Sequence, residues 1–578
     1  MARVARLGLA IGLVGVLVSA CTTLPSSSDP QAIRGFDVSS STEQQAPIAG
    51  QEPDLLLRDF YEANTNPSQR YKHARGYLTD AASERWSPGT SVLVLDGIDI
   101  NSSANSSASR RVFDVRGNIV GSLEEGGSYV SKNESYSTTI TLERVNSEWR
   151  IAELPDQIVV QRNELWNHYD PKQLYFFDTS GSTLVADRRW VFKDSSASRN
   201  SVESALITLM VGGPSRNLTP GVVNEVPSGA SFAGLSNGFY QFTGMSGLGQ
   251  DEIRRISAQF VWTLALSGSA GPFKFAFDGV PIKSERRDSE ELTVDDFAEY
   301  NPQAGASVST EIYALTNGSL RSVVGGQAAP VAGSYGAVHD IESVAISNKD
   351  KVTAAVRAVG SGDKKKSSLL LGTVGGNYSE VLSAKTMTKP TFEPGASSLW
   401  TVQDGRKIIR LARSSSGGDI VETEVSMDGL AESASGISML QLSRSGVRAA
   451  MIIGGRVYIG IVSRPNAGER RITNLHEVMP AIQDTAVSLD WDSNGSLIVG
   501  TSSSEAPVWV IAQDGSIATK LSAGNIVAPV VSVASNSSTR YITDARVALE
   551  LPNSDSATVY WREVQGLEGG RSVIVVPR

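Results

Sequence analysis

The sequence predicts a multidomain protein in which two α+β domains are followed by an all-β propeller. Three observations lead to this fold class. The chain has 578 residues, which is too long for a single hydrophobic core. In the first half, apolar residues at helical spacing precede strand-like alternation. In the second half, short strands and polar turns repeat at a nearly constant step.

The composition is typical of folded domains that face water. Hydrophobic residues make up 40% of the chain and charged residues 20%, and the formal net charge is −9. An acidic balance disfavours binding to nucleic acid or to a wide anionic lipid surface, because both repel a negative protein. We therefore expect no nucleic-acid partner.

The N-terminus has the features of an export signal. Two arginines precede an apolar run over residues 7–18 that is too short to cross a bilayer comfortably. Ser19 and Ala20 follow Val18 and place small side chains directly before Cys21, the only cysteine of the chain. A thiol in this position is a nucleophile that a processing enzyme can reach.

This arrangement resembles the bacterial lipoprotein lipobox. The resemblance implies that Val18, Ser19 and Ala20 form the signal peptidase recognition site and that residues 1–20 are removed. It also implies that Cys21 receives an S-diacylglycerol and an N-acyl chain. Because two or more chains anchor stably where one is marginal, we expect Cys21 to hold the protein in the cell membrane, on its extracellular face. The alternative is an ordinary signal peptide followed by an incidental cysteine.

Two α+β domains are expected after the anchor. Residues 21–50, rich in Ser, Pro, Thr and Gln, predict a flexible tether. Over residues 51–156, helical patterns come before antiparallel strand patterns, which predicts helices packed on one sheet, similar to the cystatin or NTF2-like architecture. Residues 157–285 predict a second domain with a clear amphipathic helix between Ile253 and Leu264. Residues 286–307 are charged and predict a linker.

Several motifs of the second domain carry a family resemblance. They are LITLM at 206–210, GP at 213–214, EVPSG at 225–229, AQFVWTL at 258–264 and FDG at 277–279. Together they are similar to a GerMN domain, which occurs in spore-germination and envelope lipoproteins.

Residues 308–578 show internal repetition. Strand–turn units contain Ser347, Glu393, Ser443 and Asp492 at equivalent places, with steps of 46, 50 and 49 residues. A period of about 40–50 residues with short strands is typical of a β-propeller. A β-sandwich is the alternative, but a sandwich does not repeat at such a step.

The lipobox, the α+β domain, the GerMN-like domain and the repeats together resemble the actinobacterial lipoprotein LpqB family, over nearly the whole chain. The resemblance implies a partner: the extracellular domain of a sensor histidine kinase of the MtrB type. It further implies that the protein modulates two-component signalling through MtrA, and with it cell-envelope homeostasis and division.

No motif indicates catalysis or metal binding. Asp490, Asp492 and Asn494 imitate the start of an EF-hand loop, but the twelfth position is Thr501 instead of glutamate. The four histidines show no metal-ligand spacing. We expect no catalytic residue, no metal and no cofactor, and a binding or regulatory function.

Two alternatives stay open: a cell-wall carbohydrate-binding protein and a propeller hydrolase. Ionised carboxylates with shifted pKa values at the mouth of the propeller channel would favour the hydrolase. An apolar or plugged channel would favour binding.

Replacement of the single cysteine tests the anchor. Cys21→Ser removes the thiol that the lipid requires, so the variant should incorporate no label when cells are grown with a clickable fatty acid. Retention of label on this variant would show that the lipid is attached elsewhere.

Overall fold

The computed structural model describes residues 47–193, 198–304, 311–413, 418–429, 435–521, 524–553 and 560–578. From residue 47 onward these residues form one compact unit. The expected signal peptide, Cys21 and most of the tether lie outside the described residues. In the part of the chain that the structure describes, no helix has both the length and the apolar character needed to span a membrane.

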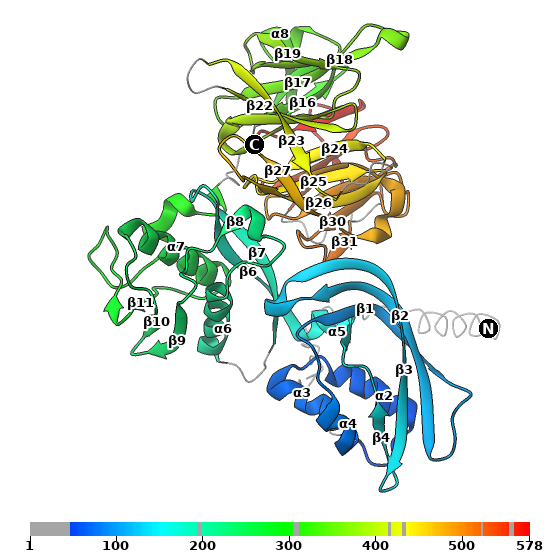
Figure 1. The fold of residues 1–578 in the computed structure, drawn as a ribbon. Coiled ribbons are helices and arrows are strands. Elements are labelled where there is room, and N and C mark those ends of the chain that lie inside the picture. Colours follow the sequence, from blue (N-terminus) through cyan, green and yellow to red (C-terminus); the bar gives the residue numbers. More distant parts are fainter. Residues whose placement is uncertain are drawn as a thin grey trace, which may run out of the picture. The chain divides into compact units, whose positions relative to one another are not determined.

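The first domain is α+β, as predicted (Figure 1). Its helices and strands are α2 (Pro53–Ala63), α3 (Ser68–Arg75), α4 (Asp80–Arg85), β1 (Val92–Ser102), β2 (Arg110–Leu123), η1 (Glu125–Gly127), β3 (Tyr129–Val145), β4 (Glu148–Glu153), β5 (Ile158–Gln161) and α5 (Arg162–His168). The sheet order is β4-β3-β2-β1-β5. Leu56 and Phe60, one helical turn apart, are buried from α2 into the core that this sheet covers.

The first sheet continues past residue 156, where the sequence patterns placed the end of the domain. β5 pairs in parallel with β1, and its three apolar residues Ile158, Val159 and Val160 are buried in the first core. A short apolar run without alternation is typical of such a strand, but it cannot be assigned to a sheet from sequence. Helix α5 follows directly and adds Leu165 to the same core.

The second domain is also α+β and contains two small sheets, β7-β6-β8 and β12-β11-β10-β9. Its elements are β6 (Tyr169–Asp178), β7 (Leu184–Phe192), α6 (Arg199–Val211), η2 (Thr219–Gly221), β8 (Val222–Val223), β9 (Ser231–Ser236), β10 (Phe239–Thr243), α7 (Gln250–Leu266), β11 (Phe275–Phe277), β12 (Val280–Pro281) and η3 (Val294–Tyr300). The predicted amphipathic helix is α7, and its Phe260 stacks on Phe242 with ring centroids 4.8 Å apart.

Two buried polar side chains fix α7 against β6. Thr263 Oγ1 accepts the N–H of Tyr175 at 3.1 Å, and Gln259 Oε1 accepts the N–H of Phe177 at 3.3 Å. Each of these buried side chains supplies an acceptor to a main-chain donor of β6.

The described part of the expected linker packs on the second domain. Phe297 and Leu292 are buried in its core, and the main-chain oxygen of Phe297 accepts the indole N–H of Trp262 at 3.0 Å. In the sequence, this apolar pair stands among charged residues, which is why the segment was predicted to be a linker. Arg287 also binds Asp296, which keeps the segment folded back on itself.

The third domain is a β-propeller, as predicted (Figure 1). Among the described residues it has six four-stranded blades, two of which join at their outer edges through β23 and β27. The blades are β36 (Ser572–Val575) with β13 (Ile312–Thr316), β14 (Ser319–Val324) and β15 (Gln327–Pro330); β16 (Ile341–Ile346), β17 (Val352–Val359), β18 (Lys366–Thr373) and β19 (Tyr378–Ala384); β20 (Thr391–Phe392), β21 (Ser398–Gln403), β22 (Lys407–Arg413) and β23 (Ile420–Met427); β24 (Ile437–Leu442), β25 (Arg448–Ile453), β26 (Arg456–Ser463) and β27 (Arg471–Glu477); β28 (Ala486–Trp491), β29 (Leu497–Thr501), β30 (Val508–Ile511) and β31 (Ala518–Lys520); and β32 (Ser532–Ser535), β33 (Thr539–Thr543), β34 (Ala548–Pro552) and β35 (Arg562–Glu563).

The repeat read from the sequence corresponds to the ends of the innermost strands. Ser347, Glu393, Ser443 and Asp492 directly follow β16, β20, β24 and β28. Three of these side chains accept main-chain N–H groups of the turn that follows, such as Asp492 Oδ1 from Ser493 at 2.7 Å. A short polar residue recurs there because it stabilises that turn.

The propeller ring is closed by its last strand. β36 pairs antiparallel with β13, so one blade is built from both ends of the domain. Ile574 and Val575 of β36 are buried in the cores on its two sides. This closure removes the unpaired edge that an open array of blades would expose.

A substitution of Ile574, a buried residue of β36, tests whether this strand stabilises the closed ring. Ile574→Ala should lower the free energy of unfolding by about 2–5 kcal/mol, because a buried isoleucine leaves a cavity. Val324→Ala, at a side chain that is 65% exposed, is the matched control and should change it by less than about 0.5 kcal/mol. Urea denaturation followed by tryptophan fluorescence measures both. Equal effects of the two substitutions would contradict this role of β36.

Candidate functional site

The sequence-predicted site residues are distributed unevenly over the structure. Val18, Ser19, Ala20 and Cys21, the expected processing and lipidation residues, lie outside the described residues. The EF-hand-like segment forms a tight turn after β28, in which Asn494 Oδ1 accepts the N–H of Ser496 at 2.9 Å. Within the described ranges, no group of three or more His, Cys, Asp or Glu residues is arranged to hold a metal ion.

Three tryptophans of the second domain and the propeller are part of the cores. Trp400 and Trp491 are fully buried between propeller strands, and Trp262 is buried in the second domain. The indole N–H of Trp491 donates to the main-chain oxygen of Gln441 at 3.0 Å. These three residues therefore stabilise the domains and do not form an exposed binding surface.

Direct contacts join the second domain to the propeller. Asp178, at the end of β6, pairs with Arg464 at 3.0 Å, and Arg448 Nη2 donates to the main-chain oxygen of Ala186 at 2.7 Å. A Cβ atom at Gly221 would lie 2.5 Å from Val447 Cγ1, so only glycine permits this close approach. Contacts that are buried and specific in geometry resist motion between domains.

The first domain contacts both of the others. Arg189 of β7 donates from Nη1 to the main-chain oxygen of Gly126 at 3.0 Å, while its Nη2 pairs with Asp187 at 2.8 Å. Trp190 is buried in the core of the first domain, and Ile517 of the propeller packs against the same core. The three domains are therefore connected pairwise.

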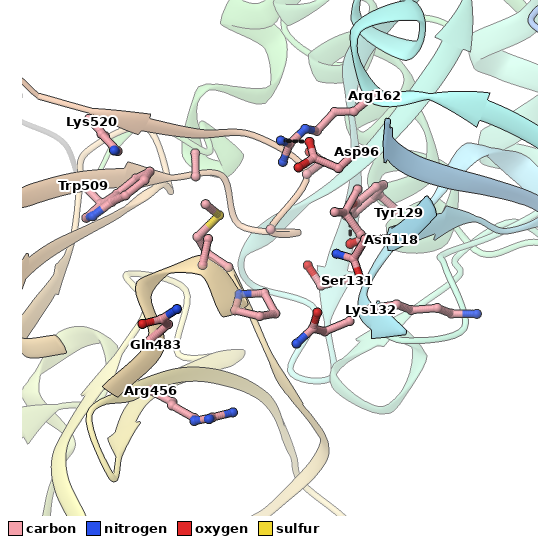
Figure 2. Close-up of a pocket in the computed structure, with 18 of the residues that line it drawn as sticks. Asp96, Asn118, Tyr129, Ser131, Lys132, Arg162, Arg456, Gln483, Trp509 and Lys520 are labelled. Atoms are coloured by element: carbon pink, nitrogen blue, oxygen red, sulfur yellow. Dashed lines mark hydrogen bonds and ion pairs between the residues drawn. The ribbon is translucent and has the colours of Figure 1, made fainter. Parts of the chain in front are cut away.

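A cleft of about 720 Å³ lies between the first domain and the propeller. Figure 2 shows residues of the first domain on one side and Arg456, Gln483, Trp509 and Lys520 of the propeller on the other. The first domain contributes side chains from β1, β2, β3 and α5. Clefts at domain interfaces are preferred places for ligands and partners.

The cleft is polar and carries an excess of positive charge. Arg162 pairs with Asp96, and Arg456 pairs with Asp484 at 2.8 Å. Lys132 has no hydrogen bond or ion pair with any described residue, and Lys520 lies over the ring of Trp509 with its Nζ 5.3 Å from the centroid. Among the described residues, neither lysine has a carboxylate partner, although the net charge of the protein is negative.

The cleft contains strained main chain. Met479 and Gln483 line the cleft and have φ angles of 55° and 53°. For residues other than glycine, such a conformation costs on the order of 1–3 kcal/mol and is found preferentially at functional sites. No local sequence motif marks this cleft, because its lining comes from two segments that are at least 290 positions apart.

The mouth of the propeller channel is polar, and arginines hold the carboxylates of Glu393 and Asp492 there. Glu393 pairs with Arg410 at 2.8 Å, and its partner Arg470 adds a second contact at 3.4 Å. Although burial alone would raise the pKa of Glu393, the hydrogen bond and the charge of Arg410 hold it below its ordinary value. Asp492 is bound in the same way by Arg540, with 2.7 Å between Nη2 and Oδ2.

The chain matches three family models. Residues 46–166 match the "Lipoprotein LpqB, N-terminal domain", residues 173–283 match "Sporulation and spore germination", and residues 318–577 match the "Lipoprotein LpqB beta-propeller domain". These models cover the first domain, the second domain and the propeller in turn.

Curated relatives match over the whole length. Lipoprotein LpqB of Corynebacterium diphtheriae is 57% identical over 570 residues, which cover 99% of this chain and 98% of the relative. Lipoprotein LpqB of Mycobacterium tuberculosis is 28% identical over 598 residues, with all of both chains covered.

Two solved structures are similar to part of the chain. The Niastella koreensis GH74 enzyme matches 45% of this chain and 53% of its own, at 13% identity and a TM-score of 0.33. The β-propeller domain of Myceliophteria thermophila Cps50 (Swd1) matches 39% of this chain and 71% of its own, at 12% identity and a TM-score of 0.27. Neither likeness bears on function, since both TM-scores lie below 0.5. From the full-length identity to its curated relatives, the chain belongs to the lipoprotein LpqB family.

Proposed function

We propose that this protein is a binding and regulatory partner of a sensor histidine kinase of the MtrB type, and that it acts at the extracellular face of the cell membrane. The observation that carries the proposal is the polar cleft of about 720 Å³ that the first domain and the propeller form together. Family membership and the lipobox-like residues 18–21 support a lipid anchor at Cys21.

The cleft fits an acidic segment of a protein partner. Lys132 and Lys520 supply positive charge, and neither forms an ion pair with a carboxylate among the described residues. Lys520 lies over the ring of Trp509, which is buried in the propeller. Complementary charges speed encounter and select the partner. An anchor confines both proteins to one surface, so that a weak intrinsic affinity is sufficient for regulation.

Charge reversal on both sides of the cleft tests the proposal. The double variant Lys132→Glu, Lys520→Glu should bind the purified extracellular sensor domain at least tenfold more weakly in calorimetric titrations, because like charges then face each other. Lys407→Glu, on an exposed residue of β22 outside the cleft, is the matched control and should bind like the wild type. Failure of the wild-type protein to bind at high micromolar concentration would contradict the proposal.

The principal alternative is a propeller hydrolase that uses the carboxylates at the channel mouth. The ion pairs of Glu393 and Asp492 favour a structural role for these groups instead. A carboxylate that is held by one or two arginines stabilises the blades, and it is poorly placed to exchange protons with a substrate.

Substitution of Glu393 separates the two roles. Glu393→Gln leaves Arg410 and Arg470 without their carboxylate and should lower the free energy of unfolding by about 3–5 kcal/mol. Glu422→Gln, on an exposed residue of the same blade, should have little effect. Folding lowers the pKa of Glu393. The difference in unfolding free energy between the wild type and Glu393→Gln should therefore be complete above pH 4.5, the ordinary pKa of a glutamate. It should disappear as the pH falls through the lower pKa of the folded state.

The same variants are then screened for hydrolysis of glycosides, esters and lactones. One robust activity in the wild type that Glu393→Gln abolishes, with stability unchanged, would favour the hydrolase.

A further inference from the structure

The propeller encloses a cavity along its central axis. Its volume is about 340 Å³, and all six innermost strands contribute to its lining. Ile346, Phe392, Leu442 and Val575 form part of an apolar wall. The rest of the lining includes many polar and charged side chains, so the cavity combines an apolar wall with polar groups that could orient a small molecule.

One part of the lining is strongly cationic. Lys389 precedes β20 and forms no hydrogen bond or ion pair with any described residue. Arg578 lies close enough to Lys389 for their charges to repel, and Arg578 itself pairs with Asp490 at 2.5 Å. Burial lowers the pKa of Lys389, and the charge of Asp490, which acts in the opposite direction, does not restore it.

Further donors reach the same cavity. Arg578 Nη2 is bound to Asp490 and to the main-chain oxygen of Trp491, whereas its buried Nη1 finds no acceptor in the part of the chain that the structure describes. Gln441 is 97% buried, and its Nε2 also has no acceptor among the described residues. Burial of a donor without a partner is unfavourable, and native proteins rarely retain several together.

Arg444 adds a further positive charge to the lining. Burial and the charge of Arg578 lower the pKa of Arg444 to about 10, with Asp490 and Asp492 acting in the opposite direction. The second carboxylate of the lining, Glu393, already pairs with Arg410 and Arg470. Neither acid of the lining therefore forms an ion pair with Lys389 among the described residues.

We propose that the propeller channel binds a small organic anion. Its carboxylate or phosphate group accepts hydrogen bonds from Lys389, Arg578 Nη1 and Gln441 Nε2, and its apolar body lies along Ile346, Phe392 and Leu442. Bound in this way, the anion satisfies the unpaired donors and compensates the positive charge. The proposal does not depend on the sensor-kinase partnership, because the cleft and the channel have no lining residue in common.

Calorimetry on the intact lipoprotein in nanodiscs tests the proposal, with empty nanodiscs as the blank. The probes share one aromatic body: benzoate, phenyl phosphate, neutral benzyl alcohol and cationic benzylamine. At least one of the two anions should bind at least tenfold more tightly than both other probes, and the tighter anion identifies the acid group. Binding of neither anion at millimolar concentration would overturn the proposal, as would equal binding of benzyl alcohol.

Removal of the unpaired cation provides the residue-level test. Lys389→Met and Gln441→Leu should each weaken binding of the preferred anion at least tenfold. Lys385→Met, on a nearby exposed residue outside the cavity, should not. The unliganded Lys389→Met variant should melt no lower than the wild type, because burial disfavours the ammonium group more than the charge of Asp490 stabilises it. Unchanged anion affinity in a folded Lys389→Met variant would overturn the proposal.

Discussion

The pairing of β36 with β13 is the interaction on which the rest of the propeller depends. It joins the end of the domain to its beginning and so fixes the six innermost strands around one axis. The same strand delivers Arg578 to the channel, three residues after Val575. Closure of the ring and the charge of its channel are thus linked, and a change in the strand affects both.

The closed ring also serves as the support for the other two domains. Arg448 and Arg464, from the blade formed by β24 to β27, hold the second domain through Ala186 and Asp178. The first domain is then held by Gly126 and by the burial of Trp190 in its core. A cleft between the first domain and the propeller keeps its geometry only if these contacts persist. We therefore regard the three domains as one connected body and not as independent domains joined by flexible linkers.

Local patterns were sufficient to predict the order of the domains. Helical spacing at Leu56 and Phe60, the amphipathic face of α7 and the propeller step all arise from contacts inside one element or one blade. The domain boundaries were harder to predict from the sequence, because β5 belongs to the first sheet only through its pairing with β1.

The candidate sites were not predictable from the sequence, because both arise from contacts between distant segments. Lys389 has no local motif, and its significance depends on Arg578, which the ring closure brings beside it. Lys132 and Lys520 are ordinary surface lysines in the sequence and share a cleft only because two domains meet. Trp400 and Trp491, by contrast, lie in the cores of single blades or between neighbouring blades.

Site-specific crosslinking in intact cells tests the central claim, that the composite cleft is the surface that engages the sensor kinase. A photoreactive amino acid is placed at Ser131 in the cleft and, as a control, at Lys407 on the outside of the propeller. The account predicts that the sensor kinase is captured from position 131 and not from position 407. Capture of the kinase from position 407 alone, or from neither position while both variants remain folded and anchored, would contradict it.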